Sequence, residues 1–191
     1  MADDANLPYL ETIFDALPPV DEIDLRVLGL DPLLAYYLRL VCARVAEVFF
    51  ERLNRFSFIS EDDPEALAGC ELALLFLICT PRGIPIDIVA WSPQSGRIGT
   101  LDGVAWALGQ EWLLRPNLDP DPVPMVYETV PQWLEARGRG LVIFDWDAAA
   151  FEVAGVPRLA VADLDFGKQL QQRLTLQPPQ IVISASLVKG G

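Results

Sequence analysis

Three closely spaced apolar segments constrain the fold of this chain more than any other feature of its sequence. The first, Leu72 to Cys79, is apolar throughout, but a membrane-spanning helix needs roughly 20 apolar residues. It therefore predicts a buried strand over Glu71 to Thr80. Two further strand patterns, Ile84 to Trp91 and Arg97 to Leu101, follow after short turns that contain glycine and proline. Loops this short join only antiparallel neighbours, so the three segments predict an antiparallel meander.

Apolar residues at helical spacing precede and follow this meander. A short helix is expected over Leu7 to Leu17, and a much longer one from Asp31 to about Asn54. The long helix would present a wide apolar face, Leu33 to Phe56, which could bury a second copy of the chain and favours a homodimer. A further helix is expected from Asp102 to near Leu114.

The C-terminal half changes to alternating strand and helix patterns. A strand over Val123 to Tyr127, a helix over Pro131 to Arg137 and a strand over Leu141 to Phe144 form one strand–helix–strand unit. Parallel pairing is usual for such a unit. The remaining expected elements are a strand Arg158 to Ala162, a helix Leu164 to Leu174 and a final strand Gln180 to Ser186.

Together these patterns predict an α/β fold, with α+β as the alternative class. We expect a mixed sheet in which the N-terminal antiparallel three-strand meander is followed by strand–helix–strand units, with helices packed on the sheet. A chain of 191 residues is near the size of one domain. The expected division is an acidic segment at 1–30 with a short docking helix, and a single α/β domain at 31–191.

Charge and residue types argue against several classes of function. The chain has no histidine and a formal net charge of −13. Without histidine it cannot form a Ser-His-Asp triad or a Cys-His nucleophile pair. Its cysteines are too far apart in sequence for a zinc motif. Direct binding of nucleic acid is not expected, because basic residues must neutralise the phosphates. These absences favour a protein that is not an enzyme.

A cluster of acids without a basic residue inside it is the main candidate for an interaction surface. It comprises Glu61, Asp62, Asp63 and Glu65. Such a surface could meet a basic protein partner or imitate a phosphate backbone, whereas the alternative is that the acids only keep an apolar chain in solution. The favoured function is that of a non-enzymatic interaction or regulatory protein, in its sharper form a DNA mimic. A structural subunit of a homo-oligomer is a further hypothesis.

The N-terminus and the apolar segments indicate where in the cell the protein is expected to reside. The first residues carry no basic region followed by an apolar stretch, so no export signal is expected. Charged residues interrupt the long apolar region at 33–50, and charges are costly at the centre of a bilayer. We therefore expect a cytoplasmic protein without membrane contact.

Acids at the end of a predicted strand give the competing hypothesis, a metal-dependent phosphodiesterase. Asp145 and Asp147 follow the strand that ends at Phe144, and α/β sheets usually bind their ligands at this end. With Glu128 they could hold Mg²⁺, the one cofactor considered, because that ion favours oxygen ligands. Asp145-Trp146-Asp147 resembles the D-x-D of toprim nucleases and primases, although its separation from Glu128 is shorter than in that family. The alternative is that the acids cap the turn after the strand.

The predicted order of elements adds Asp87 to the catalytic candidates Asp145 and Asp147. Helix, three antiparallel strands, helix and strand, over about 31–128, is similar to the PD-(D/E)xK nuclease core. The resemblance implies that Asp87 corresponds to the aspartate on the second strand of that family. The third strand, Ile98 to Asp102, lacks the family's acid and lysine in register, and without them metal binding and activation of water are not supported. The resemblance therefore implies an inactive relative or another use of the scaffold.

Overall fold

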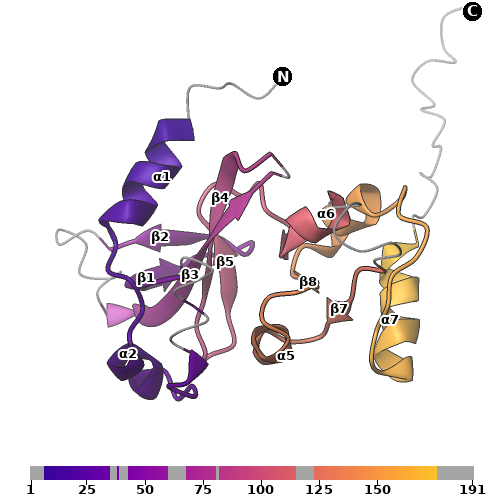
Figure 1. Cartoon of the computed structure of the whole chain (residues 1–191). Coiled ribbons are helices and arrows are strands. Elements are labelled where there is room, and N and C mark those ends of the chain that lie inside the picture. Colours follow the sequence, from indigo (N-terminus) through magenta and orange to yellow (C-terminus); the bar gives the residue numbers. More distant parts are fainter. Residues whose placement is uncertain are drawn as a thin grey trace, which may run out of the picture.

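The computed structural model describes residues 7–34, 38, 43–59, 68–80, 82–114 and 123–175, which form two β-sheets with helices packed against them (Figure 1). The larger sheet is fully antiparallel and has the strand order β2-β1-β3-β4-β5. Its strands are β1 Arg44–Phe50, β2 Phe56–Phe58, β3 Glu71–Cys79, β4 Pro85–Trp91 and β5 Ile98–Thr100.

The smaller sheet has three short strands in the order β6-β8-β7, and β8 pairs antiparallel with β6 and parallel with β7. The strands of the smaller sheet are β6 Ala107–Leu108, β7 Val126–Tyr127 and β8 Leu141–Ile143. Among the described residues, no helix has the length and apolar character needed to cross a membrane. The helices are α1 Leu7–Ala16, α2 Glu22–Val27, α5 Val130–Glu135, α6 Trp146–Glu152 and α7 Leu164–Leu174, with a 3-10 helix, η2, at Gln110–Leu114.

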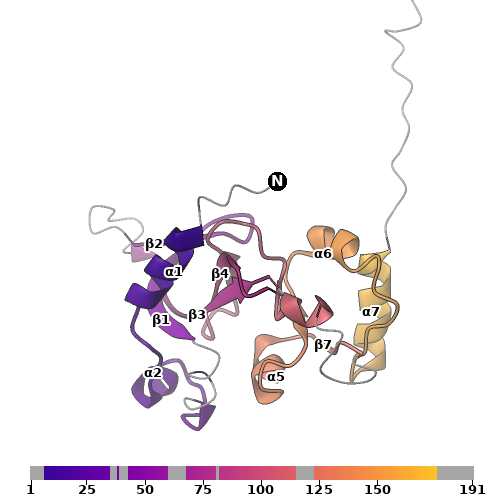
Figure 2. The same cartoon turned by 45° about the horizontal axis from the view of Figure 1, so that its top comes forward.

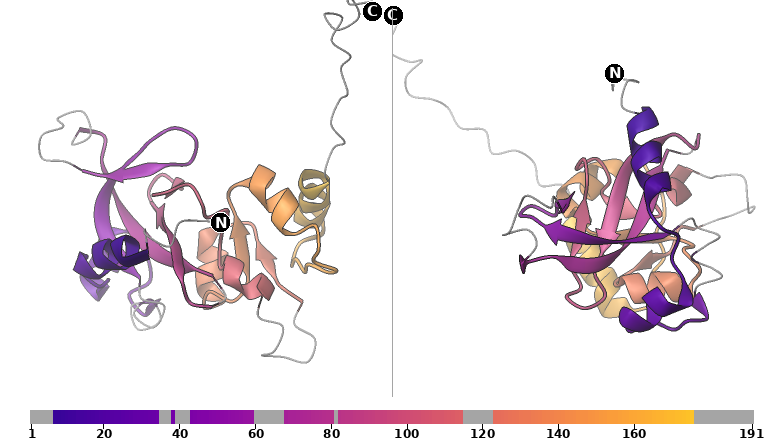
Figure 3. Two further views of the ribbon diagram at one scale, coloured as in Figure 1. Left: turned by 90° about the horizontal axis from the view of Figure 1, so that it is seen from above. Right: turned by 90° about the vertical axis from the view of Figure 1, so that its left-hand side faces the viewer.

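The core is layered in the order α1, larger sheet, smaller sheet, and then α6 with α7 (Figures 1 and 2). Along β3, Leu74 shares a buried cluster with residues of α5 and β8, whereas the next residue, Leu75, shares one with α1. Along β8, Val142 belongs to the first of these clusters and Ile143 to a third, with α6 and α7. In the right-hand view of Figure 3, α1 and the larger sheet lie in front of the orange and yellow helices of the C-terminal part. Because β3 is buried on both faces, every residue from Leu72 to Cys79 can be apolar.

The larger sheet curls until its two edges meet. Arg55, immediately before β2, forms a parallel bridge with Thr100 of β5, and the Thr100 backbone N–H donates to the Asn54 carbonyl over 2.9 Å. In the turn between β1 and β2, Leu53 and Asn54 both have left-handed backbone angles, with φ of 58° and 55°. Gly99 permits the close approach of the edges, because a Cβ there would lie 2.9 Å from the Arg55 carbonyl oxygen.

The structure confirms the fold class and its two main motifs. β3, β4 and β5 form the expected antiparallel meander, and β7, α5 and β8 form the expected strand–helix–strand unit with parallel strands. α1 and α7 also lie where the sequence predicts helices. The two motifs belong to separate sheets, an arrangement consistent with the α+β class. The division into 1–30 and 31–191 stays a prediction.

The helix predicted from Asp31 to Asn54 is wrong over its second half, where the chain forms β1. Val45 and Val48 lie in buried clusters on opposite faces of the larger sheet, as the two-residue period of a strand requires. A strand buried on both faces can carry apolar residues at helical spacing by chance, and pairing with β3 then decides the structure. The continuous helical face at Leu33 to Phe56 therefore does not form. The homodimer stays a prediction, but it cannot use that face as its interface.

The chain from Asp102 to Leu114 is also not the predicted helix. It forms a loop, β6 and η2, because Gly103 adopts a left-handed φ of 72° and the residues of β6 pair with β8. The strand expected at Arg158 to Ala162 is reduced to one parallel bridge, between Ala160 and Met125. The strand expected at Gln180 to Ser186 lies outside the described residues.

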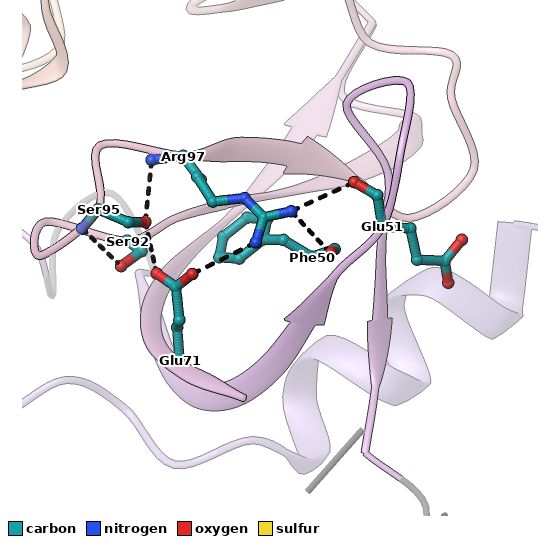
Figure 4. A network of polar contacts seen from close by, with 6 residues as sticks. All are labelled: Phe50, Glu51, Glu71, Ser92, Ser95 and Arg97. Carbon is teal, nitrogen blue, oxygen red and sulfur yellow. Dashed lines mark hydrogen bonds and ion pairs between the residues drawn. The ribbon is translucent and has the colours of Figure 1, made fainter. Parts of the chain in front are cut away.

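A polar network ties the start of β3 to the residue before β5 and to the end of β1 (Figure 4). The Arg97 guanidinium donates to the Phe50 carbonyl over 2.7 Å and pairs with Glu71 over 3.4 Å. It also lies over the Phe50 ring, 5.0 Å from its centre. Burial by itself raises the pKa of Glu71. Hydrogen bonds from Ser92 and Ser95, with the charge of Arg97, outweigh burial and bring the pKa below its ordinary value.

Glu71→Gln is expected to lower the free energy of unfolding by about 0.5–1 kcal/mol at pH 7, a modest effect because Arg97 is 45% exposed and water weakens its charge. A carboxyl whose pKa is lowered by folding stabilises the fold above its ordinary pKa. This contribution disappears as the pH falls through the lower pKa of the folded state. Urea unfolding of both proteins at neutral pH and well below the ordinary glutamate pKa measures the effect. The difference between them should shrink in acid, and a difference of constant size would contradict this assignment.

Candidate functional site

A fully buried carboxylate, Asp87, organises the loop that leads from the larger sheet to the smaller one. Its Oδ1 accepts the backbone N–H groups of Ile88 and Asp102 over 2.8 and 2.9 Å. Its Oδ2 accepts those of Val104 and Ala105 over 2.7 and 2.9 Å. Hydrogen bonds to an ionised acceptor are stronger than those between neutral groups, so the loop is fixed around this side chain.

Asp102 belongs to the same loop, and Arg55 contacts this loop from the turn before β2. Burial raises the pKa of Asp102, the charge of Asp87 raises it further, and Arg55 offsets part of the increase. The Arg55 guanidinium donates to the Leu101 carbonyl. Gly103 leaves room for it, because a Cβ at that position would overlap Nη1 of Arg55. These contacts hold the loop against the turn that precedes β2.

The predicted catalytic and metal-binding acids do not form one cluster. Asp87 is buried beneath its loop. Asp145 is the N-cap of α6, where its Oδ1 accepts the Ala148 N–H over 3.0 Å. Asp147 is exposed in the first turn of that helix, and Glu128 is exposed beside β7. In the described part of the chain, no three Cys, Asp or Glu side chains are placed to hold a metal ion.

The order of elements that resembles the PD-(D/E)xK core is not present. β1 replaces the second half of the first predicted helix, and the segment of β6 and η2 replaces the second. Asp87 does lie on β4, the second strand of the meander, as the resemblance implied. Its two carboxylate oxygens, however, are engaged by backbone N–H groups. The structure therefore gives Asp87 a structural role.

A cavity of about 300 Å³ between β7, α5 and the start of α7 brings acids together in a different way. Glu128, Glu135 and Asp163 line this acid-lined cavity, and none of its lining residues is an arginine or a lysine. Tyr127 and Phe166 add aromatic surface. The three carboxylates are not placed to share a metal ion, but the three residues line a space large enough for an organic cation.

Helix capping fixes the positions of two of these acids. The Gln132 side chain accepts the backbone N–H of Glu128 over 3.2 Å and that of Thr129 over 3.3 Å, while the Thr129 hydroxyl accepts from the Gln132 N–H. This capping box at the start of α5 holds the backbone of Glu128. Asp163 caps α7 by accepting the Phe166 N–H over 2.8 Å. Two parts of the cavity wall, at Glu128 and at Asp163, are thus ordered helix starts.

Of the three acids, Glu128 was expected from the sequence only as a possible Mg²⁺ ligand, and Glu135 and Asp163 were not expected at a site. Asp163 precedes apolar residues at helical spacing, a signal that could have placed it at the start of a helix. Nothing local could place it beside Glu135, because the two meet only through the packing of α7 near β7 and α5. The predicted interaction residues Glu61, Asp62, Asp63 and Glu65 lie outside the described residues.

Comparison with other proteins adds no name to this site. No protein-family model, curated protein or solved structure matches the chain. The charges, the cavities and their geometry are therefore the basis for a function.

Proposed function

We propose that this chain is a non-enzymatic binding protein that receives a cationic side chain of a basic protein partner in the acid-lined cavity. The observation that carries the proposal is that Glu128, Glu135 and Asp163 line one cavity without a lining cation to neutralise them. The net charge of −13 would attract a basic partner over a longer range. We also propose that the protein is cytoplasmic and that the acidic residues at 61–65 contribute to binding the basic partner.

The chemistry of the cavity favours arginine over lysine as the guest. A guanidinium is planar, stacks on aromatic faces and can donate to more than one carboxylate at once. Tyr127 and Phe166 supply aromatic surface beside the three acids. A volume of about 300 Å³ suits one inserted side chain and its immediate neighbours rather than a whole helix.

The double variant Glu128→Gln with Glu135→Gln is expected to weaken binding of an arginine-rich peptide about tenfold, since tenfold corresponds to about 1.4 kcal/mol of lost attraction. Glutamine keeps the size of each side chain and removes its charge. The measurement is fluorescence anisotropy of a labelled peptide, for the wild-type protein and the variant, at low and at physiological salt. Affinity for the wild type should fall as salt rises, because exposed charges are screened.

The matched control is Glu11→Gln with Glu152→Gln, which removes the same charge from exposed positions on α1 and α6. It should change the affinity much less than the cavity variant does. Equal losses in both variants would mean that the peptide senses only net charge. Binding that salt leaves unchanged would also contradict the proposal.

A further inference from the structure

A second cavity, of about 230 Å³, lies where three segments meet: the turn before β2, the end of β5 with the loop that follows it, and the junction of β8 and α6. Its charged lining residues are Arg55 and Asp145. Asn54 and Thr100 add polar groups, and Phe144 adds apolar surface. The cavity is distinct from the acid-lined cavity, because the two share no lining residue.

The two charged side chains in this cavity are not paired with each other, although the charge of Arg55 also acts on Asp102. No ion pair within 4.0 Å joins the described residues Arg55 and Asp145. The Arg55 guanidinium uses Nη2 to donate to the Leu101 carbonyl, and Asp145 uses Oδ1 to accept the Ala148 N–H. Each side chain therefore keeps further hydrogen-bonding capacity, one as a donor and the other as an acceptor.

The cavity walls are held in place before any ligand arrives. The Asn54 carbonyl accepts from both the backbone N–H and the hydroxyl of Thr100, over 2.9 and 3.2 Å. The Asn54 side chain donates to the Phe144 carbonyl over 3.3 Å, which joins the turn to the end of β8. A wall fixed in this way loses little conformational freedom on binding, which favours affinity for a small ligand.

We propose that this second cavity binds a free α-amino acid, with the ligand carboxylate on Arg55 and its ammonium group on Asp145. A guanidinium matches the two oxygens of a carboxylate, and an aspartate is the natural partner of an ammonium group. The volume of about 230 Å³ admits only a small molecule. Two opposite charges that line one small cavity without pairing with each other match a small zwitterion better than a simple anion or cation.

The test is the thermal unfolding of the full chain with glycine, alanine, serine or leucine at millimolar concentration. At a free ligand concentration of ten times Kd, the bound amino acid should raise Tm by about 3 °C or more. The amide and the N-acetyl derivative of the most effective amino acid each lack one charge and should have little effect. A shift with neither charge required, or no shift with any of the four, would overturn the proposal.

Two variants separate binding from a general solute effect. Asp145→Asn removes the charge, and asparagine still caps a helix well, so the variant should fold and lose the shift. Asp147→Asn makes the same change two residues away, at an exposed position that does not line the cavity, and should keep the full shift. Equal shifts in both variants would show a solute effect and overturn the proposal. The Tm of each variant without ligand reports its folding.

Discussion

Asp87→Asn is expected to lower the free energy of unfolding by roughly 2–3 kcal/mol, because a buried N–H group left without an acceptor costs about 1–3 kcal/mol and a part-buried one adds less. The asparagine oxygen can replace one carboxylate oxygen, but its NH₂ group would face two backbone N–H donors. These are the amides that Val104 and Ala105 now donate to Oδ2. Urea unfolding measures the loss, and hydrogen exchange should quicken at both amides.

Asp102→Asn is the matched control, since it removes one charge from the loop whose amides donate to Asp87. Burial and the neighbouring Asp87 raise the pKa of Asp102, so at neutral pH its charge opposes folding and its removal should be neutral or stabilising by less than about 1 kcal/mol. The hydrogen bond from the Asp102 backbone N–H to Asp87 is kept in this variant. Similar losses in the two variants would contradict the role assigned to Asp87.

Gly140→Ala is expected to lower Tm by about 6 °C or more, corresponding to roughly 3 kcal/mol, because it combines backbone strain with a steric clash. Gly140 has a φ of 107°, and a Cβ there would overlap the Met125 carbonyl oxygen. That oxygen accepts the Leu141 N–H over 2.8 Å, where β7 pairs with β8. The Gly140 carbonyl also accepts the Trp133 ring N–H over 3.0 Å. Calorimetry measures the change in Tm.

Gly155→Ala provides the comparison for this substitution. A Cβ at Gly155 would meet no heavy atom within 4 Å, and this glycine has no left-handed φ. Its replacement should change stability by no more than about 0.5 kcal/mol. If both variants unfolded at the wild-type temperature, the close approach of the chain at Gly140 would not be as the structure has it.

The parts of the fold that the sequence predicted are those in which local pattern and tertiary contacts agree. Leu72 to Cys79 is apolar at every position because both faces of β3 are covered, and its short turns leave only antiparallel neighbours. The pattern at 44–50 was misleading for the same reason. Apolar residues on both faces of β1 satisfied a helical spacing, and only the pairing with β3, distant in sequence, could decide between helix and strand.

The position of a site residue could be predicted only where neighbouring residues in one segment determine it. Asp145 and Asp147 were correctly placed after a strand, but their separation on α6, with one capping and the other exposed, required the helix itself. The role of Asp87 depends on a loop that begins fifteen residues further along the chain. The acid-lined cavity depends on Glu135 and Asp163, which belong to different helices. Contacts of this kind have no signature in local spacing.

The proposal of a cationic guest in the acid-lined cavity is tested most directly by NMR. The ¹H–¹⁵N spectrum of the full chain would be titrated with Nα-acetyl-arginine amide, which carries the guanidinium and no other charge. The largest shift changes should fall on backbone amides around the cavity, at Glu128, Gln132, Glu135 and Asp163. Changes spread evenly over acidic residues, or concentrated on α1 and α2, would contradict it.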